Sequence, residues 1–264
     1  MKKQTGNREV DVLNFWNERA SMRDLAGTND LLAKELEMNE IANHIKIGQS
    51  VLDVGCGNGL TAFYLARHRS AKVTALDYSP EMIAQAQIEQ QRLGIEESII
   101  NFRTQDVRHI ASIVERYDVV ITERVLINLA SWHEQKCAIR DLVGLLNPGG
   151  VYLMCENLKE GLDNLNALRI KLDLPVIHMP WHNRYLSRKE LDEVDFARKL
   201  AELDFTSAYY FLSRVVNAWL AKQEGLEPQY NAPVNRLALE ISHLREFAAL
   251  DLGQTRLWIW GNLT

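Results

Sequence analysis

The sequence has few cysteines, few prolines and no long apolar run. Only 3 cysteines and 6 prolines occur in 264 residues. Cys56, Cys137 and Cys155 are too few and too scattered for a disulfide framework or a Cys-x-x-Cys metal site, so we expect three free thiols. No apolar run reaches the roughly 18 residues that a membrane-spanning helix needs, and the residues after Met1 lack the apolar core of a signal peptide. We therefore expect a cytoplasmic protein without a membrane partner.

Histidine spacing and net charge exclude two further classes. The 7 histidines show no His-Glu-x-x-His or other metal spacing, so no metal site is predicted. The chain carries 30 Lys plus Arg against 35 Asp plus Glu, a net charge of −5 that does not favour a nucleic-acid partner. With 47% hydrophobic residues and no repeat or Gly/Ser linker, the length suits one larger α/β domain. The sequence leaves the oligomeric state undetermined.

Short apolar runs alternate with helix-like stretches between about residues 50 and 155. The runs are typical of buried parallel strands and lie at 51–54, 72–76, 99–103, 118–122 and 151–155. Two further strands are predicted near 208–211 and 256–260. Together they predict a Rossmann-like fold, with a seven-stranded, mostly parallel sheet and helices on both faces.

Capping residues mark the helices between these strands. Ser79 is the expected first cap of a helix that ends near Gly94. Ser131 begins the next helix, and Ser187 with Glu190 forms a later capping box. The helix that Ser131 begins is expected to stop before the Asn-Pro-Gly-Gly run at 147–150.

We expect three parts within one domain spanning residues 1–264. Residues 1–48 are predicted to form a helical cap over one face of a site, and residues 49–157 the core. Residues 158–264 are predicted to hold substrate-specific structure, because the strand–helix alternation becomes irregular there. A mostly helical stretch of about forty residues before the last strand is predicted to be an insertion or lid.

The segment at 51–59, Val-Leu-Asp-Val-Gly-Cys-Gly-Asn-Gly, joins a buried strand to a glycine-rich turn. Glycine is needed where the backbone turns sharply or touches a ligand. A dinucleotide site would need its third glycine at position 60, which is Leu60, and Asp53 would face a pyrophosphate unfavourably. The Gly-Lys-Ser/Thr of a phosphate loop is absent. A ligand with a cationic end and no phosphate fits better.

Four landmarks in a fixed order give this turn its context. They are Asp-x-Gly-x-Gly-x-Gly at 53–59, Asp77 at the end of the second strand, Asp106 after the third, and Asn-Pro-Gly-Gly before the fifth. In this order, over about residues 45–157, the sequence resembles the class I S-adenosylmethionine-dependent methyltransferases. The resemblance implies an enzyme whose cofactor is S-adenosyl-L-methionine.

The resemblance also implies contacts to the methionine and ribose parts of the cofactor. Gly55 and Gly57 would let the backbone approach the methionine part. Asp53 would hold the ammonium group, directly or through water. Asp77 would accept hydrogen bonds from both ribose hydroxyls.

The adenine contacts follow from the same resemblance. Asp106 would accept a hydrogen bond from the amino group, and the Val107 N–H would meet a ring nitrogen. Tyr78 and Met82 would sandwich the ring. The implied cofactor set is completed by two residues of the turn and one after the fourth strand: Cys56, Gly59 and Glu123.

The acceptor site is expected in the second half and after the fourth and fifth strands. Methyl transfer from a sulfonium is an in-line displacement, so the enzyme aligns the acceptor, excludes water and accepts any proton that is lost. His182 is the first candidate base, because its ordinary pKa lies near neutrality, and Glu156 is the second. Asn128, which stands where many relatives carry a histidine, completes the catalytic candidates. The expected substrate contacts are Asn166, Arg169, Trp181, Tyr185 and Tyr209.

We predict methyl transfer to an oxygen or nitrogen atom of a small molecule, such as a metabolite or a surface-glycan precursor. Three alternatives stay open. The acceptor is an RNA or a protein, the chain is an NAD-dependent oxidoreductase, or it binds the cofactor without catalysis. Direct binding of each cofactor separates the second alternative from the others.

Overall fold

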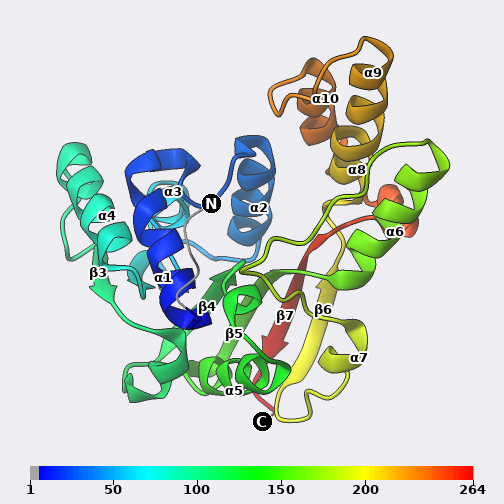
Figure 1. The fold of residues 1–264 in the computed structure, drawn as a ribbon. Coiled ribbons are helices and arrows are strands. Elements are labelled where there is room, and N and C mark those ends of the chain that lie inside the picture. Colours follow the sequence, from blue (N-terminus) through cyan, green and yellow to red (C-terminus); the bar gives the residue numbers. More distant parts are fainter. Residues whose placement is uncertain (1–5, 264) are drawn as a thin grey trace.

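The fold is described for residues 6–263 of a computed structural model, and its centre is a seven-stranded sheet (Figure 1). The strand order is β3-β2-β1-β4-β5-β7-β6. Strands β1 to β5 run parallel, and β7 pairs antiparallel with both β5 and β6. The strands are β1 (Ser50–Val54), β2 (Lys72–Asp77), β3 (Ile100–Thr104), β4 (Tyr117–Glu123), β5 (Leu146–Asn157), β6 (Arg198–Leu203) and β7 (Thr255–Gly261). The predicted Rossmann-like fold is confirmed.

Helices surround this sheet. The N-terminal region contributes α1 (Arg8–Arg19), the 3-10 helix η1 (Ala20–Leu25) and α2 (Leu31–Asn43). The core adds α3 (Leu60–Arg69), α4 (Pro80–Leu93), η2 (Val107–Ser112), η3 (Leu126–Asn128) and α5 (Trp132–Val143). After β5 come α6 (Lys159–Lys171) and α7 (Arg188–Leu191). The insertion between β6 and β7 holds α8 (Ser207–Tyr210), the π-helix η4 (Phe211–Val216), α9 (Asn217–Gln223), α10 (Pro233–Ile241) and η5 (Arg245–Leu250).

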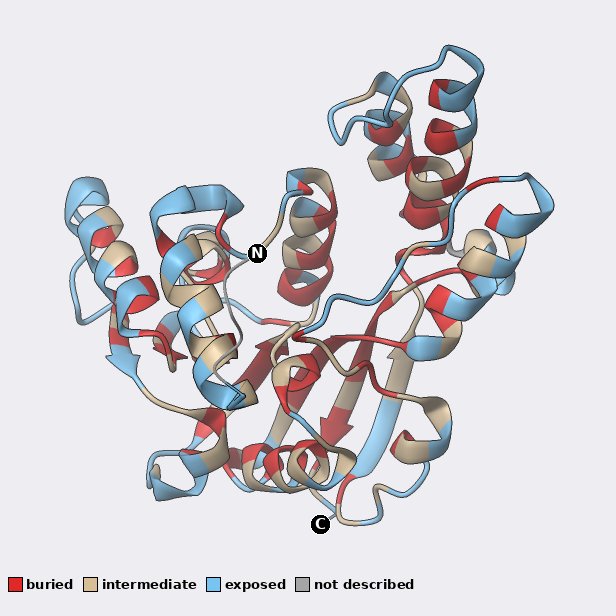
Figure 2. Cartoon of the chain, in the orientation of Figure 1, coloured by how far each residue is buried: buried red, intermediate tan, exposed pale blue. Residues whose placement is uncertain are grey.

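The central strands are buried on both faces because their side chains alternate between two apolar clusters (Figure 2). Val51 and Val119 point into the cluster that includes residues of α2, α3 and α4. Their neighbours Leu52 and Val120 point into the cluster under α5. All four side chains are fully buried. This two-sided burial explains why the strands read as continuous apolar runs.

The predicted helix caps are confirmed. The Ser79 hydroxyl accepts the Met82 N–H at 3.1 Å, and α4 ends at Gly94 in the left-handed conformation. Ser131 caps α5 in the same way, and Ser187 heads a complete capping box before α7. In the part of the chain that the structure describes, no helix is long and apolar enough to cross a bilayer.

The prediction of a strand at 208–211 is wrong. Those residues form α8 and the start of η4, where Tyr209 and Tyr210 are buried against other helices. Besides β5, the strand that pairs with β7 is β6, which begins ten residues before the predicted strand. Its sequence, Arg-Lys-Leu-Ala-Glu-Leu, lacks an apolar face because it is an edge strand with half of its residues exposed. The predicted helical insertion before the last strand is present, and α10 packs on α2.

Two glycines of the turn after β1 provide a matched test of packing. Gly55 (φ +74°) and Gly57 (φ +56°) both adopt the left-handed region, which costs an alanine about 1 kcal/mol. A Cβ on Gly55 would lie 2.2 Å from a Val125 methyl, whereas one on Gly57 would meet nothing within 4 Å. Overpacking of this kind costs about 1–3 kcal/mol more. We expect Gly57→Ala to lower the free energy of unfolding by about 1 kcal/mol, and Gly55→Ala by about 2–4 kcal/mol, in urea titrations. Equal losses would contradict the packing argument.

Candidate active site

A cavity of about 510 Å³ opens at the edge of the sheet where the parallel strands end. The turn after β1 and the ends of β2 and β4 form its floor, and α1, α2 and the loop at 177–185 form its walls. Arg214 and Tyr230 of the helical insertion reach its far side. Residues that are far apart in the chain therefore line one space.

The carboxylate of Asp77 fixes the turn after β1 to the end of β2. It accepts the N–H of Gly57 at 2.8 Å and that of Ser79 at 2.9 Å. Burial raises the pKa of Asp77 to about 6, although these hydrogen bonds oppose the shift. Asp77 also lines the cavity.

Asp53 lies behind this turn and does not line the cavity. The side chain is 1% exposed, and its Oδ2 has no hydrogen-bond partner among residues 6–263. Burial, with the nearby Glu123 charge, raises the pKa of Asp53 to about 7. An unpartnered buried carboxylate oxygen beside the turn favours a ligand that brings a positive charge to the turn.

A second group of predicted residues lies after β3. Tyr78, Met82, Asp106 and Val107 all line the cavity. The Asp106 carboxylate accepts hydrogen bonds from the Arg108 guanidinium at 3.0 and 3.1 Å. Against the effect of burial, these bonds hold the pKa of Asp106 below its ordinary value. This end of the cavity combines a carboxylate with apolar and aromatic faces, as an adenine ring requires.

A buried ionic cluster lies where β4 ends. Lys34 of α2 donates to Glu123 at 2.6 Å, and the Thr61 hydroxyl donates to the same carboxylate at 2.7 Å. The Nε of Arg124 lies 3.4 Å from the Oε2 of Glu37. Burial raises the pKa of Glu37, whereas Lys34 lowers the pKa of Glu123 in spite of burial. Glu123 is therefore a paired carboxylate at neutral pH.

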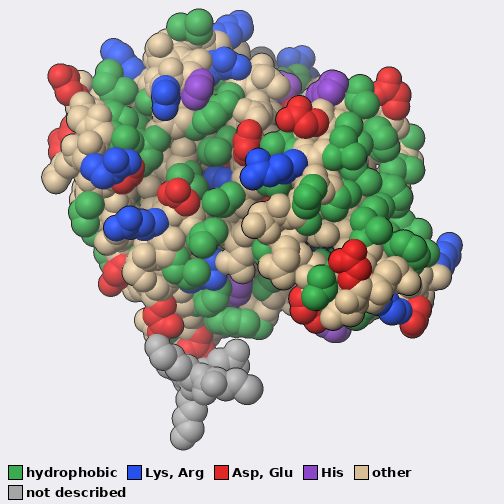
Figure 3. All heavy atoms as spheres, turned by 90° about the horizontal axis from the view of Figure 1, so that it is seen from above, with side chains coloured by type: hydrophobic (Ala, Val, Ile, Leu, Met, Phe, Trp, Pro, Cys, Tyr) green, Lys and Arg blue, Asp and Glu red, His purple; other side chains and the backbone are tan. Residues whose placement is uncertain are grey.

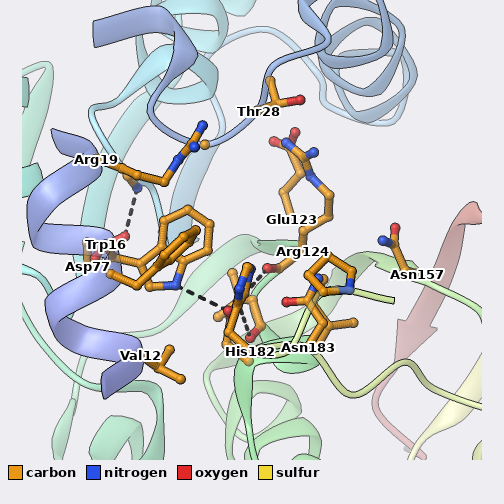
Figure 4. Close-up of a pocket in the computed structure, with 18 of the residues that line it drawn as sticks. Val12, Trp16, Arg19, Thr28, Asp77, Glu123, Arg124, Asn157, His182 and Asn183 are labelled. Carbon is orange, nitrogen blue, oxygen red and sulfur yellow. Dashed lines mark hydrogen bonds between the residues drawn. The ribbon is translucent and has the colours of Figure 1, made fainter. Parts of the chain in front are cut away.

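Helix α1 covers the cavity and contacts the loop at 177–185 (Figure 4). Arg8 donates to the carbonyl oxygens of Asn128 and His182 at 2.9 and 2.7 Å. The Trp16 indole N–H donates to the Asn128 side chain at 3.2 Å. The Phe15 ring stacks on the His182 ring, with the two ring centroids 4.3 Å apart. These contacts hold two of the three catalytic candidates, Asn128 and His182, in the cavity wall.

His182 has an unusual environment for an imidazole. It is 8% exposed, and its Nδ1 has no hydrogen-bond partner among the residues that the structure describes. Burial, together with the charges of Arg8 and Arg19, lowers the pKa of His182 to about 4. The ring is therefore neutral at pH 7 and presents an acceptor nitrogen rather than a strong base. The ordinary pKa near neutrality, which made His182 the first candidate base, therefore does not apply to this ring.

Glu156 does not reach the cavity, which corrects its assignment as a second base. It is fully buried, and its carboxylate accepts the N–H groups of Val125 and Leu126 at 3.0 Å each. Burial raises the pKa of Glu156 to about 7, although these bonds oppose the shift. Its role in the fold is to hold the segment that leads into η3.

Four of the five predicted substrate residues also lie outside this cavity. Tyr209 is fully buried and donates to Asp30 at 2.6 Å. The Asn166 side chain exchanges two hydrogen bonds with the backbone of Ile177. Trp181 is 49% exposed and packs edge-on against neighbouring rings, and Arg169 lines a separate hollow.

The other predicted residues line the cavity, apart from Asp53 and Gly59. Gly59 instead packs against Phe102. The predicted residues that line the cavity are Gly55, Cys56, Gly57, Asp77, Tyr78, Met82, Asp106, Val107, Glu123, Asn128, His182 and Tyr185.

Sequence reasoning missed the α1 residues Arg8 and Phe15, and Lys34 and Arg214. Each reaches the cavity through contacts more than fifty residues away in the chain, which no local pattern signals. The amphipathic pattern of the N-terminal region indicated a cap but not which of its side chains face the site.

Comparison with known proteins identifies the core. Residues 45–174 match the family model described as a methyltransferase domain. These residues belong to the class I S-adenosylmethionine-dependent methyltransferases. The cofactor of this class is S-adenosyl-L-methionine. The match begins just before β1 and ends after α6, so it includes every predicted cofactor residue of the methyltransferase domain.

The relatives differ in how much of the chain they match. The ubiquinone biosynthesis O-methyltransferase of Coxiella burnetii is 31% identical over 138 residues, which are 52% of this chain and 53% of that protein. The chain thus spans about half the length of the curated relatives it matches. One similar solved structure is a chain of the "Complex between the Haloferax volcanii Trm112 methyltransferase activator and the putative methyltransferase". Its TM-score is 0.59 at 14% identity, and the match covers 94% of this chain and 97% of that chain. A TehB-like S-adenosylmethionine-dependent methyltransferase from Corynebacterium glutamicum has a TM-score of 0.54 at 11% identity, covering 96% and 99%. Both structural likenesses show the fold.

The low pKa of His182 predicts how stability depends on pH. Between pH 6.5 and about 4 the unfolded chain binds a proton at this ring and the folded protein does not, so stability falls as the pH falls through this window. We expect the wild type to lose about 2 kcal/mol more than His182→Asn between pH 7 and pH 4, measured by urea titration. His133→Asn, which changes an exposed histidine of α5, is the control and should follow the wild type. Parallel losses in all three proteins would contradict the assignment.

Proposed function

We propose that this methyltransferase transfers the methyl group of S-adenosylmethionine to an oxygen or nitrogen atom of a small molecule. The observation that carries the proposal is the division of one cavity into two chemically different ends. One end holds the glycine turn, Asp77 and Asp106. The other end holds amide, phenol and guanidinium groups. These groups are not among the cofactor contacts that the family implies.

At the first end, the residues fit the cofactor. Asp77 keeps carboxylate lone pairs for ribose hydroxyls while Gly57 and Ser79 hold it in place. Tyr78 and Met82 supply surfaces for the adenine. When bound, S-adenosylmethionine supplies an electrophilic methyl group on a sulfonium. Asp53, behind the turn, supplies negative charge toward its ammonium group.

At the second end, His182 positions the acceptor. Its unpartnered Nδ1 accepts a hydrogen bond from an acceptor hydroxyl or N–H, which turns a lone pair of the acceptor atom toward the cofactor end. Asn157 and Asn183 lie on the same side and add polar contacts (Figure 4), and Tyr185 lines the same cavity. With its low pKa, the imidazole orients the acceptor and does not hold the proton that leaves.

The size and charge of the site favour a small acceptor. A volume of about 510 Å³ must hold both cofactor and acceptor, and α1 lies across it. Basic and acidic side chains are interspersed over the face seen in Figure 3, with no basic stripe for a nucleic acid. The relative from Coxiella burnetii is named as an O-methyltransferase, which supports oxygen as the acceptor atom. The family match removes the support for an NAD-dependent oxidoreductase.

Asp77→Asn is the test of the cofactor end. Loss of a charge-assisted hydrogen bond to a ligand hydroxyl costs about 1.5–3 kcal/mol, so we expect S-adenosylhomocysteine to bind about 10- to 100-fold more weakly in calorimetric titration. Asp118→Asn is the matched control, because Asp118 also accepts a backbone N–H at a strand end but lies at the opposite edge of the sheet. Unchanged affinity in Asp77→Asn, or preferential binding of NAD by the wild type, would refute this site.

A further inference from the structure

A second hollow, of about 140 Å³, lies directly behind the acceptor end of the cavity. Ile177, Arg214 and Tyr230 line both spaces, so the cavity and the hollow meet at these three residues. The rest of the hollow comes from α6 and from the helical insertion. Among the residues that the structure describes, no Asp or Glu lines it.

The hollow contains a buried cation without a counter-ion. Arg169 is 7% exposed, and its guanidinium donates to the carbonyl oxygens of Pro175 and Arg214. Within residues 6–263, no carboxylate lies within ion-pair distance of it. Burial and the nearby charge of Arg214 lower the pKa of Arg169, as expected where positive charge is uncompensated. The two carbonyl oxygens compensate this buried charge in part, and a ligand of opposite charge would complete the compensation.

The neighbouring Arg214 shows the contrast. Its guanidinium pairs with Asp30 at 2.5 Å and lies over the rings of Tyr210 and Tyr230, at 5.4 and 5.1 Å from their centroids. Asp30 is held in turn by the Tyr209 hydroxyl. Arg214 is therefore neutralised and fixed in place, and the unmatched positive charge of the hollow belongs to Arg169.

Further polar groups line the hollow around Arg169, although the Ser213 hydroxyl and the Gln229 amide already donate to the carbonyl oxygens of Tyr209 and Glu227. Ser213, Asn217 and Gln229 line the hollow with one hydroxyl and two amides. The Asn217 amide already donates to the backbone of Gln229, which fixes the loop that closes the hollow. Guanidinium groups bind carboxylate and phosphate oxygens through paired N–H donors.

We propose that this hollow binds the carboxylate or phosphate group of the methyl acceptor, so that the acceptor is a small anionic molecule. The inference rests on the proposed function, because it assigns the hollow to the far end of the acceptor site. The reacting atom lies in the main cavity near His182, and the anionic end reaches the hollow past Ile177, Arg214 and Tyr230. Arg169 is then a specificity-determining residue for the transfer.

The first test uses sodium acetate and inorganic phosphate as probes, with sodium chloride at matched ionic strength as the control. The unfolding temperature of the full chain is measured calorimetrically as each salt is raised. We expect a saturable rise with acetate or phosphate, beyond any rise in chloride. A larger effect of acetate assigns a carboxylate, and a larger effect of phosphate assigns a phosphate group. Equal responses to all three salts would overturn the proposal.

Variants of the hollow make the test specific. Arg169→Gln should weaken oxyanion binding at least tenfold. Arg169→Lys keeps the positive charge but lacks the paired donors, so we expect an affinity between those of Arg169→Gln and the wild type. Because Arg169 also holds two carbonyl groups, Asn217→Asp provides an independent variant. It places a carboxylate in the lining of the hollow, and we expect it to abolish the response to both oxyanions. An undiminished response in Asn217→Asp would refute the site.

Binding of S-adenosylhomocysteine to the same proteins separates the two proposals. We expect Arg169→Gln and Asn217→Asp to bind it as the wild type does, since neither residue lines the main cavity. Cofactor binding without any oxyanion response would overturn the inference and leave the proposed function intact. An oxyanion response in a wild type that fails to bind the cofactor would overturn the proposed function, and the acceptor assignment with it.

Discussion

The hydrogen bonds that Asp77 accepts from Gly57 and Ser79 are the constraint on which the site depends. They join the loop after β1 to the loop after β2, at the point where two parallel strands end. The left-handed backbone at Gly55 and Gly57 makes this approach possible. Because one carboxylate both shapes the turn and lines the cavity, the fold and the cofactor end of the site cannot be altered independently.

The acceptor end is assembled differently, from pieces distant in the chain. Helix α1, the loop at 177–185 and the helical insertion each contribute side chains. Buried charges around the cavity are compensated in pairs, as for Lys34 with Glu123 and Arg214 with Asp30. The guanidinium of Arg169 is the contrasting case, because it donates to two carbonyl oxygens and not to a carboxylate.

The sequence was sufficient to predict the parallel core and the cofactor end, because both depend on local patterns. Buried strands read as apolar runs, and the residues after them meet at one edge of the sheet. It was insufficient for β6, an edge strand without an apolar face, and for Glu156, whose burial only the fold reveals. The pKa of His182 likewise depends on Phe15 and Arg8, more than a hundred residues away. The acceptor side is built from such long-range contacts.

The attachment of α1 has a consequence for how specificity can diversify. Arg8 binds the carbonyl oxygens of Asn128 and His182, which every amino acid possesses. Exchanging the side chains of the acceptor loop, such as Asn183 or Tyr185, leaves these two anchors in place. The attachment of α1 over the site therefore does not depend on which side chains contact the acceptor. A scaffold of this kind permits new acceptor preferences to evolve, or to be engineered, without rebuilding the cover.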